Sequence, residues 1–150
     1  MLRVSQATSH DIEVLVGLLG YLFKQEEEFK PNHALQKKGL ALILENDKIG
    51  AIFVLKDHDM VIGMVSLLWS ISTAMGGRVA ILEDMILHPD YRGKGCGKML
   101  LQHAIEYAKE HKCKRVTLLT DTKNHSAQEF YGHFGFQESS MKAMRLYLEE

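Results

Sequence analysis

The sequence predicts a mixed α/β (α+β) fold, in which one central sheet with parallel and antiparallel neighbours is flanked by helices. Three observations predict it. Apolar residues at helical spacing lead up to Phe23, short β-rich runs follow in the middle of the chain, and helical and strand patterns then alternate. Closely spaced strands favour antiparallel hairpins, whereas a helical crossover gives parallel neighbours. The 150 residues, 46% of them hydrophobic, suit a single domain over residues 1–150.

The chain is expected to begin with a strand and two helices. Leu2 to Ala7 alternates as a strand does, and Thr8 or Ser9 can cap the helix that follows. One apolar stripe marks this helix, made of Ile12, Leu15, Val16, Leu19, Leu22 and Phe23. The polar stretch 24–32, with Pro31 and Asn32 at its end, ends this helix and can cap a second one that reaches to about Leu44.

Strands then dominate, with two more helices among them. The expected strands are Ile49–Leu55, Met60–Leu68, Val79–Leu87, Val116–Thr120 and Met144–Leu148. Asp57, His58 and Asp59 make a hairpin the natural connection between the first two of these. The expected helices are one with Leu100, Leu101, Ala104, Ile105 and Ala108 on one face, and a short one at Ser126–Phe134.

Composition narrows the class of protein. The formal net charge of -1 supplies no broad attraction to nucleic acid or to an anionic membrane. The uncharged run from Met60 to Gly77 is too short and too polar for a membrane span. Two cysteines and the lack of a targeting segment favour the cytoplasm. The eight histidines show no metal-ligand spacing, so no metal is expected.

The most informative segment lies directly after a strand and directly before an amphipathic helix. It reads Arg92, Gly93, Lys94, Gly95, Cys96, Gly97 and Lys98. Its glycines let the backbone approach an anion, and the helix start offers unpaired N–H groups and a positive dipole end. The spacing matches neither the Walker loop nor the dinucleotide fingerprint. The pattern indicates a pyrophosphate site; the alternative is a flexible surface turn with basic residues.

This segment resembles the acetyl-CoA signature of the GNAT acetyltransferase superfamily, Arg/Gln-x-x-Gly-x-Gly/Ala, at Arg92, Gly95 and Gly97. Downstream, Asn124 and the run Phe130–Phe136 resemble the family's Asn and its Tyr-x-x-x-Gly-Phe end. The resemblance runs clearly from about Ile81 to Phe136. It implies the GNAT acyl-CoA N-acyltransferase fold and an acetyl-CoA-dependent N-acetyltransferase.

The resemblance also implies residues that bind the cofactor. The main chain of Met85, Ile86 and Leu87 would hydrogen-bond the pantetheine arm like an added strand. The amides of residues 92–98 would cradle the pyrophosphate. Asn124 would bond the amide region of acetyl-CoA, or it could cap the helix that follows.

For chemistry, the resemblance implies that Tyr131 protonates the departing thiolate as a general acid. A core aromatic is the alternative for Tyr131. A base must take a proton from the amine, and Glu83 is preferred over Asp84. Adjacent strand residues point to opposite faces unless a bulge intervenes, so only one of them is expected to face the acceptor. A structural salt bridge is the third option for this pair.

The expected acceptor is a primary amine of a small molecule, such as a polyamine, an amino sugar or an amino acid. Leu119 stands where ribosomal-protein N-terminal acetyltransferases carry a glutamate, which disfavours a peptide N-terminus. The acidic stretch 25–29, with Tyr21 and Trp69 nearby, could attract a cationic substrate or form a solvated loop. The alternatives are a protein or peptide amine, O-acetyl or longer acyl transfer, and a non-catalytic acyl-CoA-binding module. The resemblance is also compatible with a homodimer.

Overall fold

A computed structural model of the chain describes residues 1–25 and 32–149. It contains two compact units, Met1–Leu119 and Thr120–Glu150. The prediction that residues 1–150 act as one domain stays a prediction. The acidic stretch predicted as a substrate lip lies outside the described residues, except for Gln25.

The first unit is built on a five-stranded mixed sheet in the order β1-β2-β3-β4-β5. The strands are β1 Leu2–Gln6, β2 Gly50–Asp57, β3 Met60–Ser72, β4 Gly77–Leu87 and β5 Val116–Leu118. The first four pair antiparallel, and β5 pairs parallel with β4 after a helical crossover. The predicted fold class and the predicted hairpin at His58 are therefore confirmed. β5 is shorter than predicted, ending at Leu118 rather than Thr120.

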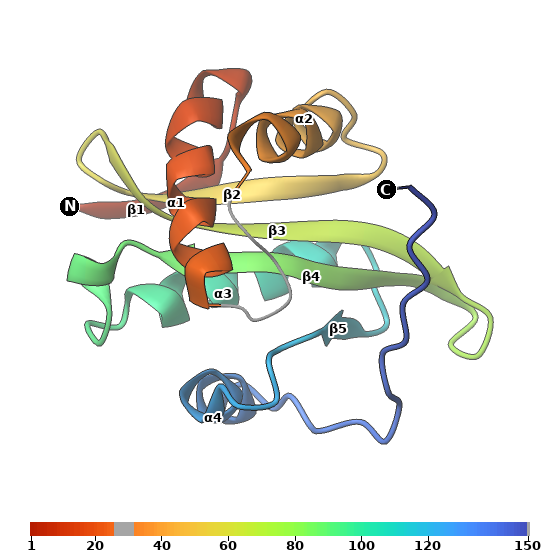
Figure 1. Cartoon of the computed structure of the whole chain (residues 1–150). Helices are drawn as coiled ribbons and strands as arrows, with labels where there is room; N and C mark the ends of the chain where they lie inside the picture. The colour runs from red at the N-terminus through yellow and green to blue at the C-terminus, as the bar shows by residue number, and fades with distance from the viewer. Residues whose placement is uncertain (26–31, 150) are drawn as a thin grey trace. The chain divides into compact units, whose positions relative to one another are not determined.

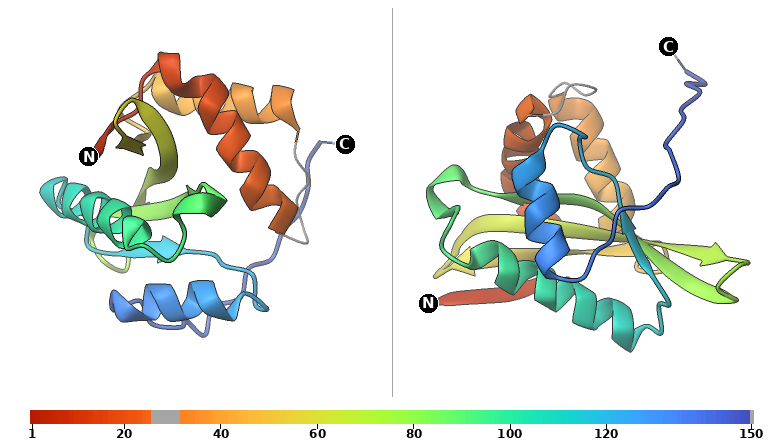
Figure 2. Two further views of the ribbon diagram at one scale, coloured as in Figure 1. Left: turned by 90° about the vertical axis from the view of Figure 1, so that its left-hand side faces the viewer. Right: turned by 90° about the horizontal axis from the view of Figure 1, so that it is seen from below.

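Three α-helices cover the two faces of this sheet (Figures 1 and 2). α1 Ile12–Gln25 and α2 His33–Leu44 lie on one face, and α3 Cys96–Glu110 lies on the other. A short turn, η1 Ser9–Asp11, precedes α1 and is capped by Thr8 in a reciprocal capping box with Asp11. Asn32 caps α2, because its Oδ1 accepts a hydrogen bond from the amide of Leu35 at 3.1 Å. Both predicted helix starts are confirmed.

The core fills both faces of the sheet and fixes the central strands. Under α1 and α2, the buried cluster includes Leu15, Leu19, Leu40, Ile52, Val54, Met64 and Ile86. On the other face, α3 buries Leu100, Leu101, Ala104 and Ala108. Because both faces are packed, β3 and β4 form a rigid platform whose register decides which way each polar side chain points.

The second unit contains one helix, α4 His125–His133. The strand predicted at Met144–Leu148 is wrong, since the described residues from 136 onward form no helix or strand. Met144, Leu146 and Leu148 are each more than four-fifths exposed. Alternating apolar residues favour a strand, but a strand also needs a hydrogen-bonded partner for its backbone. Among the described residues, the five-stranded sheet contains no strand that follows β5 in the sequence.

None of the described helices has the length and apolar composition that crossing a membrane requires.

Candidate active site

The predicted phosphate loop connects the end of β4 to the start of α3. After β4, the short turn η2 Pro89–Tyr91 leads into a backbone that is left-handed at Gly93 (φ 75°) and Gly95 (φ 80°). A side chain at either position would be strained in this conformation. Gly95 is the N-cap residue of α3, and it has no side chain with which to satisfy the first amides of the helix. The loop therefore turns sharply and presents the positive end of a 15-residue helix.

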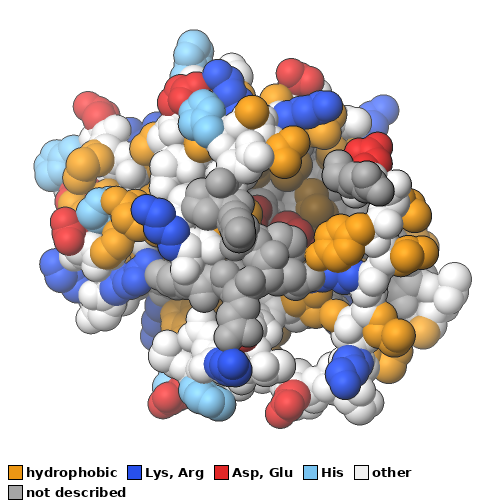
Figure 3. Space-filling model, viewed as in Figure 1, with side chains coloured by type: hydrophobic (Ala, Val, Ile, Leu, Met, Phe, Trp, Pro, Cys, Tyr) orange, Lys and Arg blue, Asp and Glu red, His pale blue; other side chains and the backbone are white. Residues whose placement is uncertain are grey.

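Basic side chains surround this turn. Arg92, Lys94 and Lys98 are all exposed, and the ammonium of Lys94 lies 5.7 Å from the centre of the Tyr91 ring. Cys96 and Gly97 are buried, so the Cys96 side chain packs into the protein at the start of α3. On the face drawn in Figure 3, basic and acidic side chains are interspersed. The loop itself therefore carries three exposed cationic side chains next to the start of α3.

Tyr91 ties the start of the loop to the β2–β3 hairpin. Its hydroxyl donates a hydrogen bond to Oδ2 of Asp57 at 2.9 Å. The other carboxylate oxygen of Asp57 lies 3.0 Å from Nδ1 of His58 and 3.6 Å from the amino group of Met1. The bond from Tyr91 lowers the pKa of Asp57 below its ordinary value and raises that of Tyr91. The sequence indicated Asp57 only as a turn residue, and this anchoring role was missed.

We expect Tyr91→Phe to weaken acetyl-CoA binding severalfold while leaving the fold intact. The ring and its contacts remain, but the loop loses its link to Asp57 and must be ordered by the ligand instead. Isothermal titration with acetyl-CoA measures the change. Tyr107→Phe, the same change on α3, is the matched control. Equal affinity for wild type and Tyr91→Phe would contradict the anchoring role.

The strand that precedes the loop has an open edge. β5 pairs with β4 only at Ala80, Ile81 and Leu82. Beyond Leu82, the residues Met85, Ile86 and Leu87 pair with β3 on one side. On the other side, no strand among the described residues continues the sheet. This edge can accept an extended ligand as an added strand, and it leads directly into the glycine turn.

The two acidic candidates lie at a bulge of β4. Ser66 pairs with Asp84, whereas the next residue, Leu67, pairs with Leu82, so Glu83 is the extra residue. Asp84 shares a face with Ser66, whose partner in β2 is Ile52 from the core under α1 and α2. Asp84 therefore faces the side of the sheet covered by α1 and α2.

Ser66 holds Asp84 through two contacts. The amide of Asp84 donates to Oγ of Ser66 at 3.1 Å, and the Ser66 hydroxyl donates to Oδ2 of Asp84 at 3.3 Å. Ser66 is fully buried, whereas Asp84 is half-buried and Glu83 is exposed. Sequence reasoning missed Ser66, although a signal existed, since it is a lone polar residue inside the apolar run of β3.

Trp69 does not lie where the sequence suggested. It stacks on Tyr107 of α3 and on His111, the C-cap residue of that helix, with ring centres 6.0 Å and 5.5 Å away. Because these rings belong to the α3 side of the sheet, the side chain of Trp69 lies on the face that α3 covers. Asp84 points to the opposite face, which α1 and α2 cover. Tyr21 of α1 does lie near the end of β4, with its ring 5.5 Å from that of His88.

In the second unit, Asn124 caps α4. Its Oδ1 accepts a hydrogen bond from the amide of Ala127 at 3.1 Å, which confirms the capping interpretation. Its predicted bond to the cofactor stays a prediction.

Tyr131 belongs to an aromatic cluster in the same unit. Its ring centre lies 5.4 Å from that of Phe130 and 5.6 Å from that of Phe136. Burial raises the pKa of Tyr131 to about 12. The phenol therefore stays protonated, and able to donate, at any pH at which an enzyme works.

A tyrosinate absorbance titration checks this pKa. Below its ordinary pKa of about 10, Tyr131 is neutral in the folded and unfolded states alike. As pH rises through that value to about 12, the unfolded chain releases the proton first, so stability falls over this window. We expect the difference between wild type and Tyr131→Phe to show no tyrosinate below about pH 11. Ionisation of Tyr131 near pH 10, with circular dichroism still native, would contradict the assignment.

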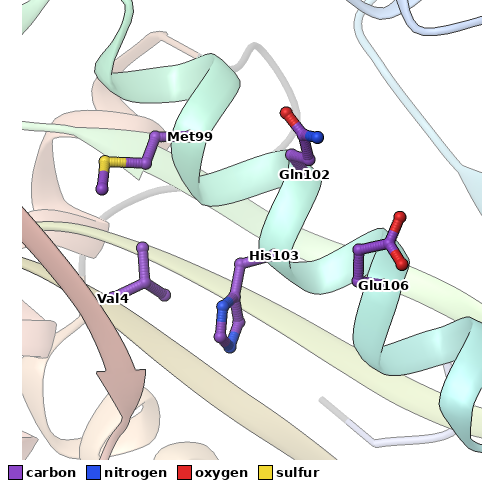
Figure 4. A pocket seen from close by; sticks show the side chains of 5 residues that line it. All are labelled: Val4, Met99, Gln102, His103 and Glu106. Carbon is purple, nitrogen blue, oxygen red and sulfur yellow. The ribbon is translucent and has the colours of Figure 1, made fainter.

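A separate pocket of about 350 Å³ lies between β1 and α3 (Figure 4). It is lined by Val4, Met99, Gln102, His103 and Glu106, none of which the sequence indicated as a site residue. Within the described residues, no group of three or more His, Cys, Asp or Glu side chains could hold a metal ion. The expectation of a metal-free enzyme stays a prediction.

The sequence profile of the Acetyltransferase (GNAT) family matches residues 14–136. The chain belongs to this family. The predicted resemblance and the predicted enzyme class, an N-acetyltransferase, are thereby confirmed.

Individual GNAT proteins are similar in sequence to this chain over aligned regions of different length. The uncharacterised N-acetyltransferase YhfO of Bacillus subtilis is 27% identical over 93% of this chain and 92% of its own length. Aminoalkylphosphonate N-acetyltransferase of Salmonella typhimurium is 24% identical over 93% of this chain and 88% of its own length. The uncharacterised N-acetyltransferase MJ1207 of Methanocaldococcus jannaschii is 40% identical over 42% of this chain, which spans only 28% of that protein.

The GNAT fold is confirmed by solved structures. A possible acetyltransferase from Clostridium difficile 630 superposes with a TM-score of 0.88, covering 100% of this chain and 99% of that one. Its sequence is 16% identical, so the likeness concerns the fold.

Proposed function

We propose that this GNAT protein transfers the acetyl group of acetyl-CoA to a primary amine of a small molecule, by direct attack in a ternary complex. The observation that carries the proposal is the continuous path from the open edge of β4 through the left-handed glycine turn to the start of α3. An extended arm fits the edge, and a diphosphate fits the turn.

Each part of acetyl-CoA then has a partner in this chain. The main chain of Met85, Ile86 and Leu87 bonds the pantetheine arm. The amides of residues 92–98 bind the diphosphate, and Arg92, Lys94 and Lys98 add positive charge around it. The side-chain oxygen of Asn124 caps α4, and its side-chain NH2 group donates a hydrogen bond to the amide region of the cofactor.

The reaction forms a C–N bond and breaks a C–S bond. The nitrogen lone pair of the amine attacks the thioester carbonyl, and the nitrogen loses a proton to a carboxylate of the β4 bulge, directly or through water. The thiolate leaves as coenzyme A and takes up a proton from solvent. Because the pKa of Tyr131 is about 12, above the roughly 8.5 of a simple thiol, the phenol stabilises the thiolate mainly by donating a hydrogen bond.

The acceptor is the least constrained part of the proposal. One relative of similar length is named for a small aminoalkylphosphonate. Leu119, in place of the glutamate of N-terminal acetyltransferases, also favours a small molecule over a peptide. The protein acts in the cytoplasm in this proposal, and a homodimer is compatible with it.

Two assays on the full chain test the proposal. Isothermal titration measures acetyl-CoA binding, and a thiol-release assay measures turnover over a panel of polyamines, amino sugars, amino acids, aminoalkylphosphonates and peptides. We expect binding together with turnover on at least one small amine. Binding without turnover on any acceptor would instead support a non-catalytic acyl-CoA-binding module, and turnover on peptides alone would support a protein acetyltransferase.

A further inference from the structure

We propose that Ser66 is a positioning residue that fixes Asp84 at the β4 bulge, and thereby makes Asp84 rather than Glu83 the carboxylate that takes the amine proton. This inference rests on the proposed function. It goes beyond it by choosing between the two carboxylates and by assigning a role to a residue of the neighbouring strand.

The first step of the argument is the burial of Ser66. It is the one buried polar side chain among the described residues, and it lies in the middle of β3 between Val65 and Leu67, which are also buried. Burying a hydroxyl is unfavourable unless its hydrogen bonds are made. Here the hydroxyl both accepts from the Asp84 amide and donates to the Asp84 carboxylate.

The second step is the bulge itself. The extra residue, Glu83, disturbs the regular ladder of β4 directly before Asp84. At this point the Ser66 hydroxyl accepts a hydrogen bond from the Asp84 amide. The same hydroxyl donates a hydrogen bond to Oδ2 of Asp84, so one side chain positions both the backbone and the carboxylate of Asp84. Glu83, the extra residue, is exposed and receives no comparable support from Ser66.

The third step is the direction in which Asp84 faces. Its face is the one under α1 and α2, and its strand is the one whose edge is open beyond Leu82. A base is effective only when it is held in hydrogen-bonding geometry with the proton it takes. The proton passes from the attacking nitrogen to the Asp84 carboxylate, directly or through one water, and from there to solvent.

The test compares Ser66→Ala with Ser66→Thr in steady-state and single-turnover assays with the best amine found. We expect Ser66→Ala to lower kcat about tenfold and to move the acidic limb of its pH profile, with the Kd for acetyl-CoA unchanged. Ser66→Thr keeps the hydroxyl and should recover most of the rate. Ser70→Ala, the same change four residues further along β3, is the matched control.

A double-mutant cycle separates positioning from a general structural effect. If Ser66 acts through Asp84, Ser66→Ala adds little to the loss of about 100-fold expected for Asp84→Asn. Its effect should remain fully additive with that of Glu83→Gln. The reverse pattern, or a Ser66→Ala enzyme with wild-type kcat and pH profile, would overturn the inference. A wild-type protein that turns over no amine at all would instead refute the proposed function, so the two failures are distinguishable.

Discussion

Gly95→Trp is expected to raise the Kd for acetyl-CoA by about 100-fold or more, the equivalent of losing one or two hydrogen bonds to a charged group. Gly95 is left-handed at φ 80°, and a Cβ built on it meets no atom of the protein beyond its chain neighbours within 4 Å. A side chain at this position therefore begins in open space. It would occupy the space above the first amides of α3, where we propose that the diphosphate binds.

The control has to separate steric blocking from backbone strain. Gly76→Trp does so, because Gly76 is also left-handed (φ 70°), also has open space around it, and lies in the β3–β4 turn away from the loop. Both variants should lose similar stability in thermal unfolding, since both place a side chain in an unfavourable conformation. Isothermal titration then decides: near-wild-type affinity of Gly95→Trp would remove the diphosphate from this turn.

Most of the framework was predictable, because it depends on local patterns. Hydrophobic periodicity located α1 and α3, short side chains marked the caps at Thr8 and Asn32, and the position of the glycines located the loop. The prediction of a final strand was wrong because a strand depends on contacts that are not local in the sequence. An alternating segment such as 144–148 says which residues could share a face, but only a partner strand can make it part of a sheet.

The candidate site was predictable only where the motif is continuous in sequence. The loop residues follow one another, so their spacing carries the information. The contact between Ser66 and Asp84 depends on a bulge in β4, and the contact between Tyr91 and Asp57 joins residues 34 positions apart. No spacing rule indicates such contacts, because register shifts and hairpin ends are settled by packing over the whole sheet. The lone serine in an apolar strand was the one local hint.

Tyr131→Phe is expected to lower the rate of acetyl transfer about 100-fold with little change in acetyl-CoA affinity. Phenylalanine keeps the aromatic contacts with Phe130 and Phe136. It removes only the hydroxyl, which is neutral in the folded protein because burial raises its pKa.

Stability should therefore hold, and only the hydrogen bond to the departing thiolate is lost. Single-turnover measurements report the chemical step without product release, and Tyr107→Phe on α3 is the matched control for loss of a phenol. If Tyr131 serves only as a core aromatic, the single-turnover rate stays at the wild-type value. A large drop in rate at unchanged affinity and stability distinguishes the two roles, because an aromatic that only packs contributes equally before and during the reaction.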